Sequence, residues 1–359
     1  MSNRDFEIKT YGSIDKVPEE EWESLDTEGD IFYGRGFLNL LEKNHTVCYL
    51  TIKHKGESIA KCSFYNMTVN LLELVPYNKR KVARILFKLL NKKTIQKIAI
   101  LGLPLSLPIN NVKIKKQDSI CQGIIISEFN KFSIKTNSKI NIIHSFGKND
   151  AFKCPRKYNV LYLINFVLKF NSYSSYLSTI RGTYLRHIKH SFKKDILHWD
   201  TFKGTFNNEH YKLYLNVFKK ADSKFEKISK PFFDGLIRLG NFNTILAKDK
   251  YNPLAFFSFF YSKNKSYMFK VGLDYKFNRT YDLYFNLLNM YIRKTVGKES
   301  NLGYTSDYVK MRLGGVPEQR RIFFKINNPF WNIFAHCFTP IKPKLSNKLP
   351  RAYKNEVKG

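Results

Sequence analysis

Two histidines on one predicted helix are the first candidates for chemistry. His187 and His190 lie three residues apart and would share a helix face, a spacing that could place two imidazoles on one metal ion. No third ligand accompanies them, so we interpret them as part of a solvated basic face and predict no metal site. The glycine-rich phosphate loops, the His-Glu-x-x-His motif and the Gly-x-Ser-x-Gly motif do not occur in the sequence. Clustered-carboxylate chemistry is also not expected, because acids are sparse after residue 30.

Positive charge is the strongest feature of the composition. The 359 residues carry a formal net charge of +32, and because the first 30 residues have a net charge of −7, the rest of the chain carries +39. Such a field attracts polyanions. The cations predicted to contact phosphates lie along one basic segment: Arg181, Arg186, Lys189, Lys193 and Lys194. Two alternatives remain open at this point. The lysines of this segment and of residues 78–93 form a polyanion path, or they are the polar faces of core-packed helices in a chain with AT-rich codon usage.

The elements that would position these residues repeat in two halves, each with a helix, a strand hairpin, an amphipathic helix and a strand. The first half is predicted to contain helices 32–44 and 78–93 and strands 47–53, 58–67, 98–103 and 120–127. The second half is predicted to contain strands 160–168, 244–247, 254–261, 267–273, 302–305 and 322–326, helices 172–195, 208–221, 230–239 and 281–296, and a turn at 308–315. A looser stretch at 131–157 is predicted to join the halves.

Four segments carry a resemblance to a known family. Strands and a helix followed by YTSDYVKMRLGG (304–315) resemble the C-terminal half of a GNAT-type acyltransferase domain. The chain is similar to the tandem GNAT proteins related to the Fem aminoacyl transferases in three further segments: FYGRGFLNLLEKN (32–44), SYSSYLSTIRGTYLRHIKHSFKK (172–194) and LAFFSFFYSKNKSYMFKVGLDYKF (254–277). The resemblance covers about residues 31–326.

The resemblance implies an α/β fold of two GNAT-like domains, each with a mixed, mostly antiparallel sheet flanked by helices. The domains expected are 1–150 and 151–326, the second with the acyl-transfer cleft, followed by an aromatic and basic tail at 327–359. The implied activity is transfer of an acyl or aminoacyl group from an activated donor to an amine or hydroxyl. The alternative is a non-enzymatic protein that binds RNA or another polyanion on the same scaffold.

The resemblance also assigns site residues. A Lys-x-x-hydrophobic-Gly turn brings a lysine to the acyl site in this family, and Lys310 through Gly314 match it. A fixed cation there would stabilise the negative charge that develops on the carbonyl oxygen. Asp307 is expected to act as a base or to orient the acceptor amine, or instead to cap the turn. The substrate contacts are assigned to Arg312, Arg279, Tyr304, Tyr308 and Gly314. The apolar residues of this turn are expected to anchor it while Lys310 and Arg312 face a cleft.

One departure from the family pattern bears on the donor. The glycine loop with which acetyl-CoA-using GNAT domains bind pyrophosphate corresponds here to KFNRTYD (276–282), which has no glycine. We therefore expect no tightly bound cofactor and an activated donor as co-substrate, either aminoacyl-tRNA, an acyl-carrier protein or acyl-CoA. The expected partners are tRNA or an acidic acyl-carrier protein; the sequence does not indicate an oligomeric state.

Several patterns bear on location in the cell. The longest uncharged windows, 98–112 and 326–341, are shorter than a membrane-spanning helix, and residues 1–11 lack an apolar signal core. Five scattered cysteines are typical of reduced thiols: Cys48, Cys62, Cys121, Cys154 and Cys337. We predict a cytoplasmic protein that contacts the inner membrane face peripherally. Phe330, Trp331, Phe334 and Phe338, followed by lysines, would lie at the membrane interface or pack on the first domain.

Overall fold

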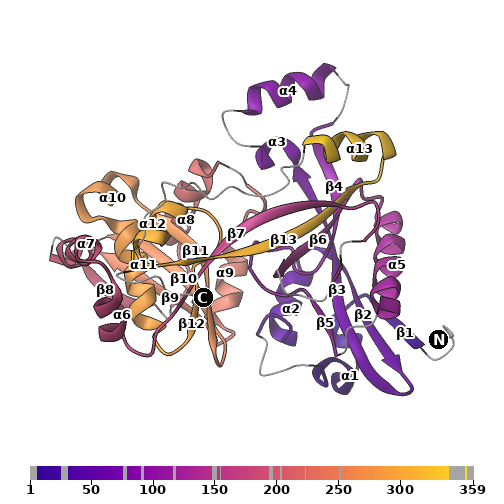
Figure 1. The fold of residues 1–359 in the computed structure, drawn as a ribbon, viewed down its shortest axis with the longest axis horizontal. Helices are drawn as coiled ribbons and strands as arrows, with labels where there is room; N and C mark the ends of the chain where they lie inside the picture. The colour runs from indigo at the N-terminus through magenta and orange to yellow at the C-terminus, as the bar shows by residue number, and fades with distance from the viewer. Residues whose placement is uncertain are drawn as a thin grey trace. The chain divides into compact units, whose positions relative to one another are not determined.

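The computed structural model places the chain in two compact units (Figure 1). It describes residues 6–25, 31–75, 79–89, 93–115, 119–147, 152–153, 155–193, 197–202, 204–222, 224–250, 252–338 and 352–353. Unit 1 comprises Met1–Leu163, Asp222–Glu226 and Gln319–Pro343. Unit 2 comprises Ile164–Ala221, Lys227–Glu318 and Lys344–Gly359. The domain boundary expected near residue 150 and the separate tail from residue 327 stay predictions.

Unit 1 is built on a mixed sheet in the order β1-β2-β3-β4-β6-β13, with β5 paired to β3. Among its described strand pairs, only β4 and β6 are parallel. Its strands are β1 (Phe6–Tyr11), β2 (Thr46–His54), β3 (Glu57–Asn70), β4 (Ile95–Leu101), β5 (Val112–Ile114), β6 (Ile140–Gly147) and the later part of β13 (Val316–Ile326). Its helices are the 3-10 turn Ile14–Lys16, α1 (Glu19–Glu23), α2 (Arg35–Glu42), α3 (Leu71–Leu74), α4 (Arg80–Leu89), α5 (Ser119–Lys135) and α13 (Pro329–Phe338).

Helix α5 corrects the strand predicted at 120–127. The β-branched run around Ile124 favours a strand by composition. However, Cys121, Ile125, Phe129 and Phe132 recur at helical spacing and are buried against the sheet, where the Phe129 ring lies 5.4 Å from the ring of Phe64. Burial of this stripe therefore outweighs the local preference. The helix and β6 also occupy much of the stretch that was predicted to be a loose connection.

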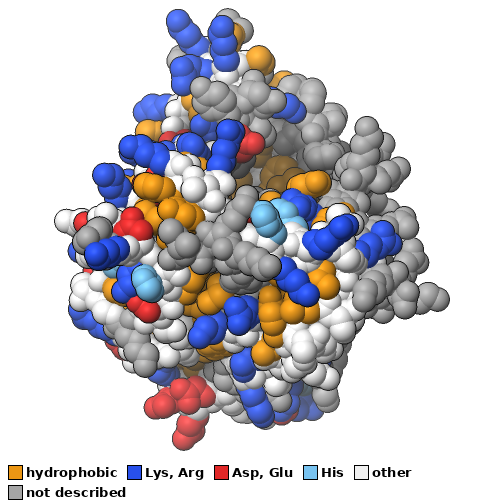
Figure 2. All heavy atoms as spheres, turned by 90° about the vertical axis from the view of Figure 1, so that its left-hand side faces the viewer, with side chains coloured by type: hydrophobic (Ala, Val, Ile, Leu, Met, Phe, Trp, Pro, Cys, Tyr) orange, Lys and Arg blue, Asp and Glu red, His pale blue; other side chains and the backbone are white. Residues whose placement is uncertain are grey.

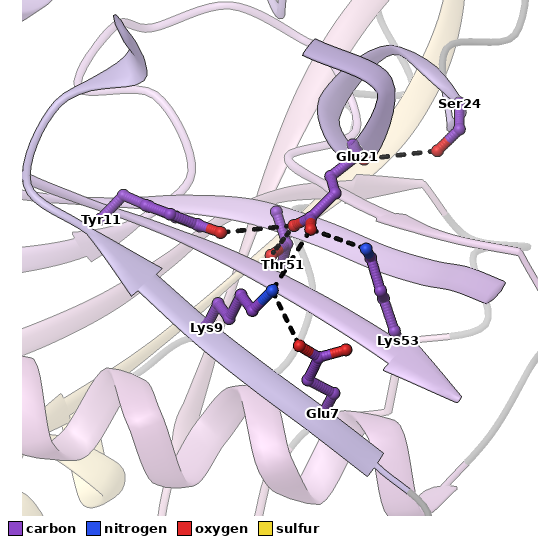
Figure 3. Close-up of polar contacts among 7 residues, drawn as sticks. All are labelled: Glu7, Lys9, Tyr11, Glu21, Ser24, Thr51 and Lys53. Atoms are coloured by element: carbon purple, nitrogen blue, oxygen red, sulfur yellow. Dashed lines mark hydrogen bonds and ion pairs between the residues drawn. The ribbon is translucent and has the colours of Figure 1, made fainter. Parts of the chain in front are cut away.

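A buried carboxylate organises the acidic N-terminal part of unit 1. Glu21, on α1, is 7% exposed and lies against the sheet, 2.6 Å from Lys53 Nζ (Figure 3). Thr51 Oγ1 and Tyr11 Oη donate hydrogen bonds to its carboxylate at 3.2 and 3.3 Å. Burial alone would raise the pKa of Glu21, but Lys53, Thr51 and Lys9 together outweigh it and lower the pKa. The local acidity of the N-terminus is thus partly neutralised within the fold.

Unit 2 contains the strands at the other end of this strand order, β7-β12-β11-β10-β9-β8, and among its described strand pairs only β11 and β12 are parallel. Its strands are β7 (Asn159–Lys169), β8 (His198–Phe202), β9 (Phe242–Lys248), β10 (Pro253–Tyr261), β11 (Lys265–Leu273) and β12 (Glu299–Asn301). Its helices are α6 (Tyr173–Thr179), α7 (Gly182–Lys193), α8 (Asn208–Lys220), α9 (Lys230–Ile237), α10 (Tyr275–Tyr281), α11 (Leu283–Lys294) and α12 (Asp307–Arg312). The α/β class with mostly antiparallel mixed sheets is confirmed.

Both faces of the unit 2 sheet are covered. Along β10, Phe257 and Phe259 contact the ring of Tyr291 on α11, while Phe256, the residue before Phe257, packs against Phe206 and Phe233 on the opposite face. Buried strands with apolar residues on both faces are typical of a sheet between two helical layers. The sheet therefore holds α11 and the segments that follow it in a fixed position.

One long predicted helix is divided in the structure, and another is preceded by a short helix that was not predicted. The segment 172–195 forms α6 and α7, because Ile180 has extended backbone and ends the first helix. The segment 281–296 corresponds mainly to α11, and a separate α10 precedes it. The two helices meet at Asp282, a left-handed residue with φ of 51°. His187 on α7 and Asp282 between α10 and α11 both belong to the candidate site.

Among the described helices, none has the length and apolar character needed to cross a membrane. Cys48, Cys62 and Cys121 are free thiols, and burial raises the pKa of Cys48 to about 11. Cys154 and the side chain of Cys337 lie outside the described residues. The described part also contains no group of three or more His, Cys, Asp or Glu residues that could hold a metal ion.

Candidate active site

The candidate site begins where two parallel strands stop pairing. Residues Lys265–Tyr267 of β11 pair with Glu299–Asn301 of β12, and β12 ends there while β11 continues to Leu273. The chain then runs through a loop, residues 302–306, in which three residues have positive φ: Gly303 (72°), Thr305 (68°) and Ser306 (58°). Left-handed backbone is uncommon for residues other than glycine and persists only where the surroundings impose it. Specific contacts must therefore stabilise this loop conformation.

Lys310 provides such contacts. It lies on α12, which replaces the predicted turn, and its ammonium donates to the carbonyl oxygens of Gly303 at 2.8 Å and Tyr304 at 2.7 Å. Its Nζ is 5.7 Å from the centre of the Phe166 ring, and the residue is 1% exposed. The expectation that Lys310 faces an open cleft is therefore corrected: the side chain points inward because two backbone carbonyls attract it.

Burial gives Lys310 an unusual acidity. It lowers the pKa from 10.5 to about 7, and nearby Asp307 opposes this shift by favouring the charged form. A lysine near pKa 7 exists in both protonation states at neutral pH. This value is in the range that general acid–base catalysis requires.

Arg312 lies two residues further along and has different surroundings. Its guanidinium carbon lies 5.6–5.9 Å from the ring centres of Tyr184, Phe285 and Tyr308. Its Nη2 donates to Nδ1 of His187 at 3.0 Å. Within the described residues no carboxylate comes within ion-pair distance of Arg312. A half-buried arginine without an anionic partner is suited to bind an anionic group of a ligand.

His187 and Asp282 extend this cluster. His187 Nε2 lies 3.2 Å from Asp282 Oδ2. Burial lowers the pKa of His187 and the neighbouring Arg312 cation lowers it further, while Asp282 opposes them. A neutral imidazole with its lone pair on Nδ1 can accept from Arg312. Sequence reasoning had assigned His187 to a solvated basic face. Tyr184 and His187 lie three residues apart on α7, so their spacing indicates that the two side chains share one side of this helix. Both contact Arg312 of α12.

The other predicted site residues lie around this cluster to different degrees. Asp307 is the first residue of α12, and Tyr308 is 58% exposed with its ring beside Arg312. The carbonyl oxygen of Tyr304 accepts a hydrogen bond from Lys310. Arg279 is exposed on α10, one turn before Asp282. The roles of these residues in substrate binding stay predictions.

The cations predicted to contact polyanions divide into two groups. Arg186 and Lys189 are exposed on α7 (Figure 2 shows the face of the molecule on the left of Figure 1, where blue side chains greatly exceed red ones). Arg181 instead holds the chain near its end, since its Nε donates to the Tyr353 carbonyl at 2.5 Å and its N–H to the Ala352 carbonyl at 2.7 Å. Lys194 and the side chain of Lys193 lie outside the described residues.

Tyr353 also packs closely against Gly314, where a residue with a side chain would not fit. The φ of Gly314 is +82°, and a Cβ added there would lie 2.7 Å from Oη of Tyr353, whose hydroxyl donates to the Gly314 carbonyl. We expect Gly314→Ala to lower the free energy of unfolding by about 2–4 kcal/mol, from left-handed strain and overpacking. Thermal unfolding measures this loss. Gly297→Ala is the matched control, because Gly297 has the same φ but no atom within 4 Å of an added Cβ. Equal losses in both variants would show that Tyr353 plays no part.

Comparison with known proteins gives structural matches only. No protein-family model matches the chain, and no curated protein matches it. Among solved structures, it is similar to FemX with 8% identity and a TM-score of 0.54, covering 90% of this chain and 99% of FemX. It also matches a tandem GNAT protein from the clavulanic acid biosynthesis pathway (9% identity, 89% of this chain and 97% of that one, TM-score 0.49). A third match is L-PGS from Bacillus licheniformis (11% identity, 69% and 86%, TM-score 0.40). The predicted resemblance to Fem-type proteins is confirmed at the level of the fold.

Proposed function

We propose that this chain is an acyltransferase that moves an acyl or aminoacyl group from an activated donor to an amine or hydroxyl, with its reaction centre at the 302–306 loop and α12. The observation that carries the proposal is the pair of cations on one short helix. One is buried with a pKa of about 7, and the other is half-buried among three aromatic rings. The fold shared with FemX supports the proposal.

The two cations suit different parts of an acyl transfer. Attack of an amine or hydroxyl on the donor carbonyl places negative charge on its oxygen, and a preorganised cation lowers the barrier by stabilising that charge. Because Lys310 is 1% exposed and donates to the carbonyls of Gly303 and Tyr304, its charge would act on that oxygen from within the protein and not by direct contact. Arg312 would bind a phosphate or carboxylate of the donor or acceptor through its two-pronged guanidinium.

The positive charge is compatible with each of the candidate donors. All three candidate donors, an aminoacyl-tRNA, an acyl-carrier protein and an acyl-CoA, are anionic. The exposed cations are Arg279 on α10, the helix that ends just before Asp282, and Arg186 and Lys189 on α7, the helix that carries His187. A phosphate-rich donor would bind in a salt-dependent way, with affinity falling as counterions compete.

The test presents each donor class, with a radiolabelled acyl group, to the full chain in the presence of hydroxylamine as a general acceptor. We expect catalytic consumption of one class. Arg312→Gln should lower kcat/KM for that donor by about 10- to 100-fold, mainly through KM, because a charge-assisted contact contributes about 1.5–3 kcal/mol. Arg293→Gln is the matched control, since Arg293 also lies over an aromatic ring, that of Tyr173 at 5.1 Å, but near the other end of α11.

The alternative, a non-enzymatic polyanion binder, makes a different prediction in the same assay. No donor would then be consumed faster than in the same mixture without protein, while tRNA would still bind with an affinity that falls steeply with salt. That result would refute the proposed activity. Binding that is insensitive to salt would refute both functions and leave codon usage as the reason for the positive charge.

A further inference from the structure

Exposed hydrophobic side chains collect at one end of unit 1. Among the described residues, eight large hydrophobic side chains are exposed, and two of them, Ile8 and Tyr308, lie elsewhere. The other six are Val82 (61% exposed), Ile85 (52%), Ile95 (61%), Ile134 (78%), Phe330 (69%) and Ile333 (68%). Single exposed hydrophobic residues are ordinary, but a group of six at one place indicates a surface that contacts something apolar.

Strand register establishes that these six residues share one end of the sheet. Asn70, the last residue of β3, pairs with Ile95, the first residue of β4. Ile140, the first residue of β6, pairs with Ile98 of β4 and with Ile326, the last residue of β13. The helices α3 and α4 follow β3, α13 follows β13, and α5 ends just before β6. The helices α3, α4 and α13 and the last turn of α5 therefore lie at this end of the strands, and Figure 1 draws α3, α4 and α13 at the top.

Helix α4 has the character of an interfacial helix. Arg80 fixes its first turn by donating from Nε to the Val75 carbonyl at 2.9 Å and from Nη2 to the Asp222 carbonyl at 2.6 Å. Val82 and Ile85, three residues apart, share an apolar side that remains exposed. The alternative in which 78–93 is a core-packed helix is therefore wrong for these two residues. An amphipathic helix with basic residues on its polar side is typical of a segment that lies in a membrane interface.

The charge of this end is strongly positive. The sequence segments 67–100, 130–140 and 324–338 contain a single acid, Glu73, and the segment 222–226, which contacts α3 and α4, adds Asp222 and Glu226. The exposed cations described there are Lys79, Lys81, Arg84, Lys88, Lys93, Lys97, Lys131, Lys135 and Lys139. Lysine and arginine surrounding apolar side chains complement a surface that is anionic outside and apolar beneath.

We propose that this end of unit 1, which we term the docking end, binds the surface of a bilayer rich in anionic phospholipids. Val82, Ile85, Phe330 and Ile333 would enter the headgroup region, with Lys81 and Arg84 over lipid phosphates. A nucleic acid would use the cations but gives no reason to expose six large hydrophobic residues. A second copy of this chain would bring two strongly basic surfaces together, which like-charge repulsion opposes. The proposal is independent of the acyl-transfer function.

The test is sedimentation of the full chain with vesicles of phosphatidylcholine, alone or mixed with phosphatidylglycerol. We expect at least tenfold stronger binding to the anionic vesicles. Replacing both apolar residues of α4, Val82→Ser with Ile85→Ser, should weaken that binding at least tenfold, because each buried carbon group adds to the partition energy. Lys81→Gln with Arg84→Gln should weaken it about 10- to 30-fold on anionic vesicles. These four side chains are exposed, so the variants should fold as the wild type does.

Matched controls come from other parts of the chain. Ile8→Ser removes an exposed isoleucine from β1, and Lys16→Gln with Lys55→Asn removes two exposed cations near the N-terminus and at the β2–β3 turn; neither variant should change vesicle binding. Trp331, on α13, provides an independent signal: its fluorescence should shift to shorter wavelength with anionic vesicles and be quenched by brominated lipids, and Trp331→Phe should abolish both effects.

Three outcomes would overturn the proposal. One is vesicle binding that survives Val82→Ser with Ile85→Ser but is competed by tRNA, which would indicate a nucleic-acid surface. Another is absence of vesicle binding together with a dimer that this double variant dissociates, which would indicate a second copy as the occupant. A third is equal binding to neutral and anionic vesicles by the wild type, which would remove the role of charge.

Discussion

The stability of the wild-type protein is expected to rise with pH above 7 in a way that Lys310→Met abolishes. The pKa of Lys310 is about 7 in the folded protein and 10.5 as the ordinary lysine value. Between these values the unfolded chain binds a proton that the folded chain does not, so the free energy of unfolding rises with pH. The slope is about 1.4 kcal/mol per pH unit, and the full change is on the order of 5 kcal/mol.

Urea unfolding of both proteins at pH 7.5, 8.5 and 9.5 measures this difference. Lys310→Met should be less stable at each pH, since the carbonyls of Gly303 and Tyr304 lose their donor, and the gap should widen as the pH rises. Lys298→Met is the matched control: Lys298 Nζ also donates to two carbonyls, those of Ser262 and Lys263, but the residue is only half-buried. Parallel pH curves for wild type and Lys310→Met would contradict the lowered pKa.

Gly102→Ala is expected to be the most destabilising glycine substitution in unit 1. Gly102 has φ of +108°, and an added Cβ would lie 2.4 Å from Cβ of Asn111. Asn111 is fully buried and connects its surroundings by accepting from the Leu103 N–H at 2.8 Å and donating to the carbonyls of Ile109 and His144. Displacing it adds lost hydrogen bonds to backbone strain, for a loss of about 3–6 kcal/mol.

Thermal and urea unfolding check this loss, and another glycine serves as the opposite control. Gly123 lies exposed within α5, and an added Cβ there meets nothing within 4 Å. Gly123→Ala should therefore raise the free energy of unfolding by about 0.5–1 kcal/mol through helix propensity. If Gly102→Ala instead melted within 2 °C of the wild type, the tight contact with Asn111 would be wrong.

Much of the fold could be predicted from the sequence because many elements have a clear local signal. The β2–β3 hairpin agrees with the strands predicted at 47–53 and 58–67, between which Gly56 has φ of 80°, and the helix predicted at 230–239 begins directly after its capping residue Ser229. Helix α5 was missed because its β-branched residues favour a strand locally, and only burial against the sheet reveals the helical stripe. Tertiary packing decided that element.

The candidate site was predicted less completely, and for a physical reason. The sequence indicated Lys310 and Arg312 as neighbours with one orientation, but a helix turns residues two positions apart to different sides. Lys310 turns inward to carbonyls of the 302–306 loop, while Arg312 meets His187 and Tyr184 from α7, more than a hundred residues earlier. No sequence-spacing rule connects such distant segments, so the contacts of Arg312 with α7 could be identified only from the three-dimensional structure.

The position of β13 has a consequence for the order of events during synthesis. Strand β6 pairs on one side with β4 and on the other with β13, whose paired residues Arg320–Ile326 are made more than 170 residues after Gly147. While the ribosome synthesises residues 164–318, the side of β6 that pairs with β13 in the finished protein has no partner strand, and the docking end is incomplete. An unpaired strand edge is a site for aggregation, and such long-range pairing is slow. The sheet of unit 1 can therefore be completed only after most of unit 2 has been synthesised, so unit 1 should not finish folding before the rest of the chain follows it.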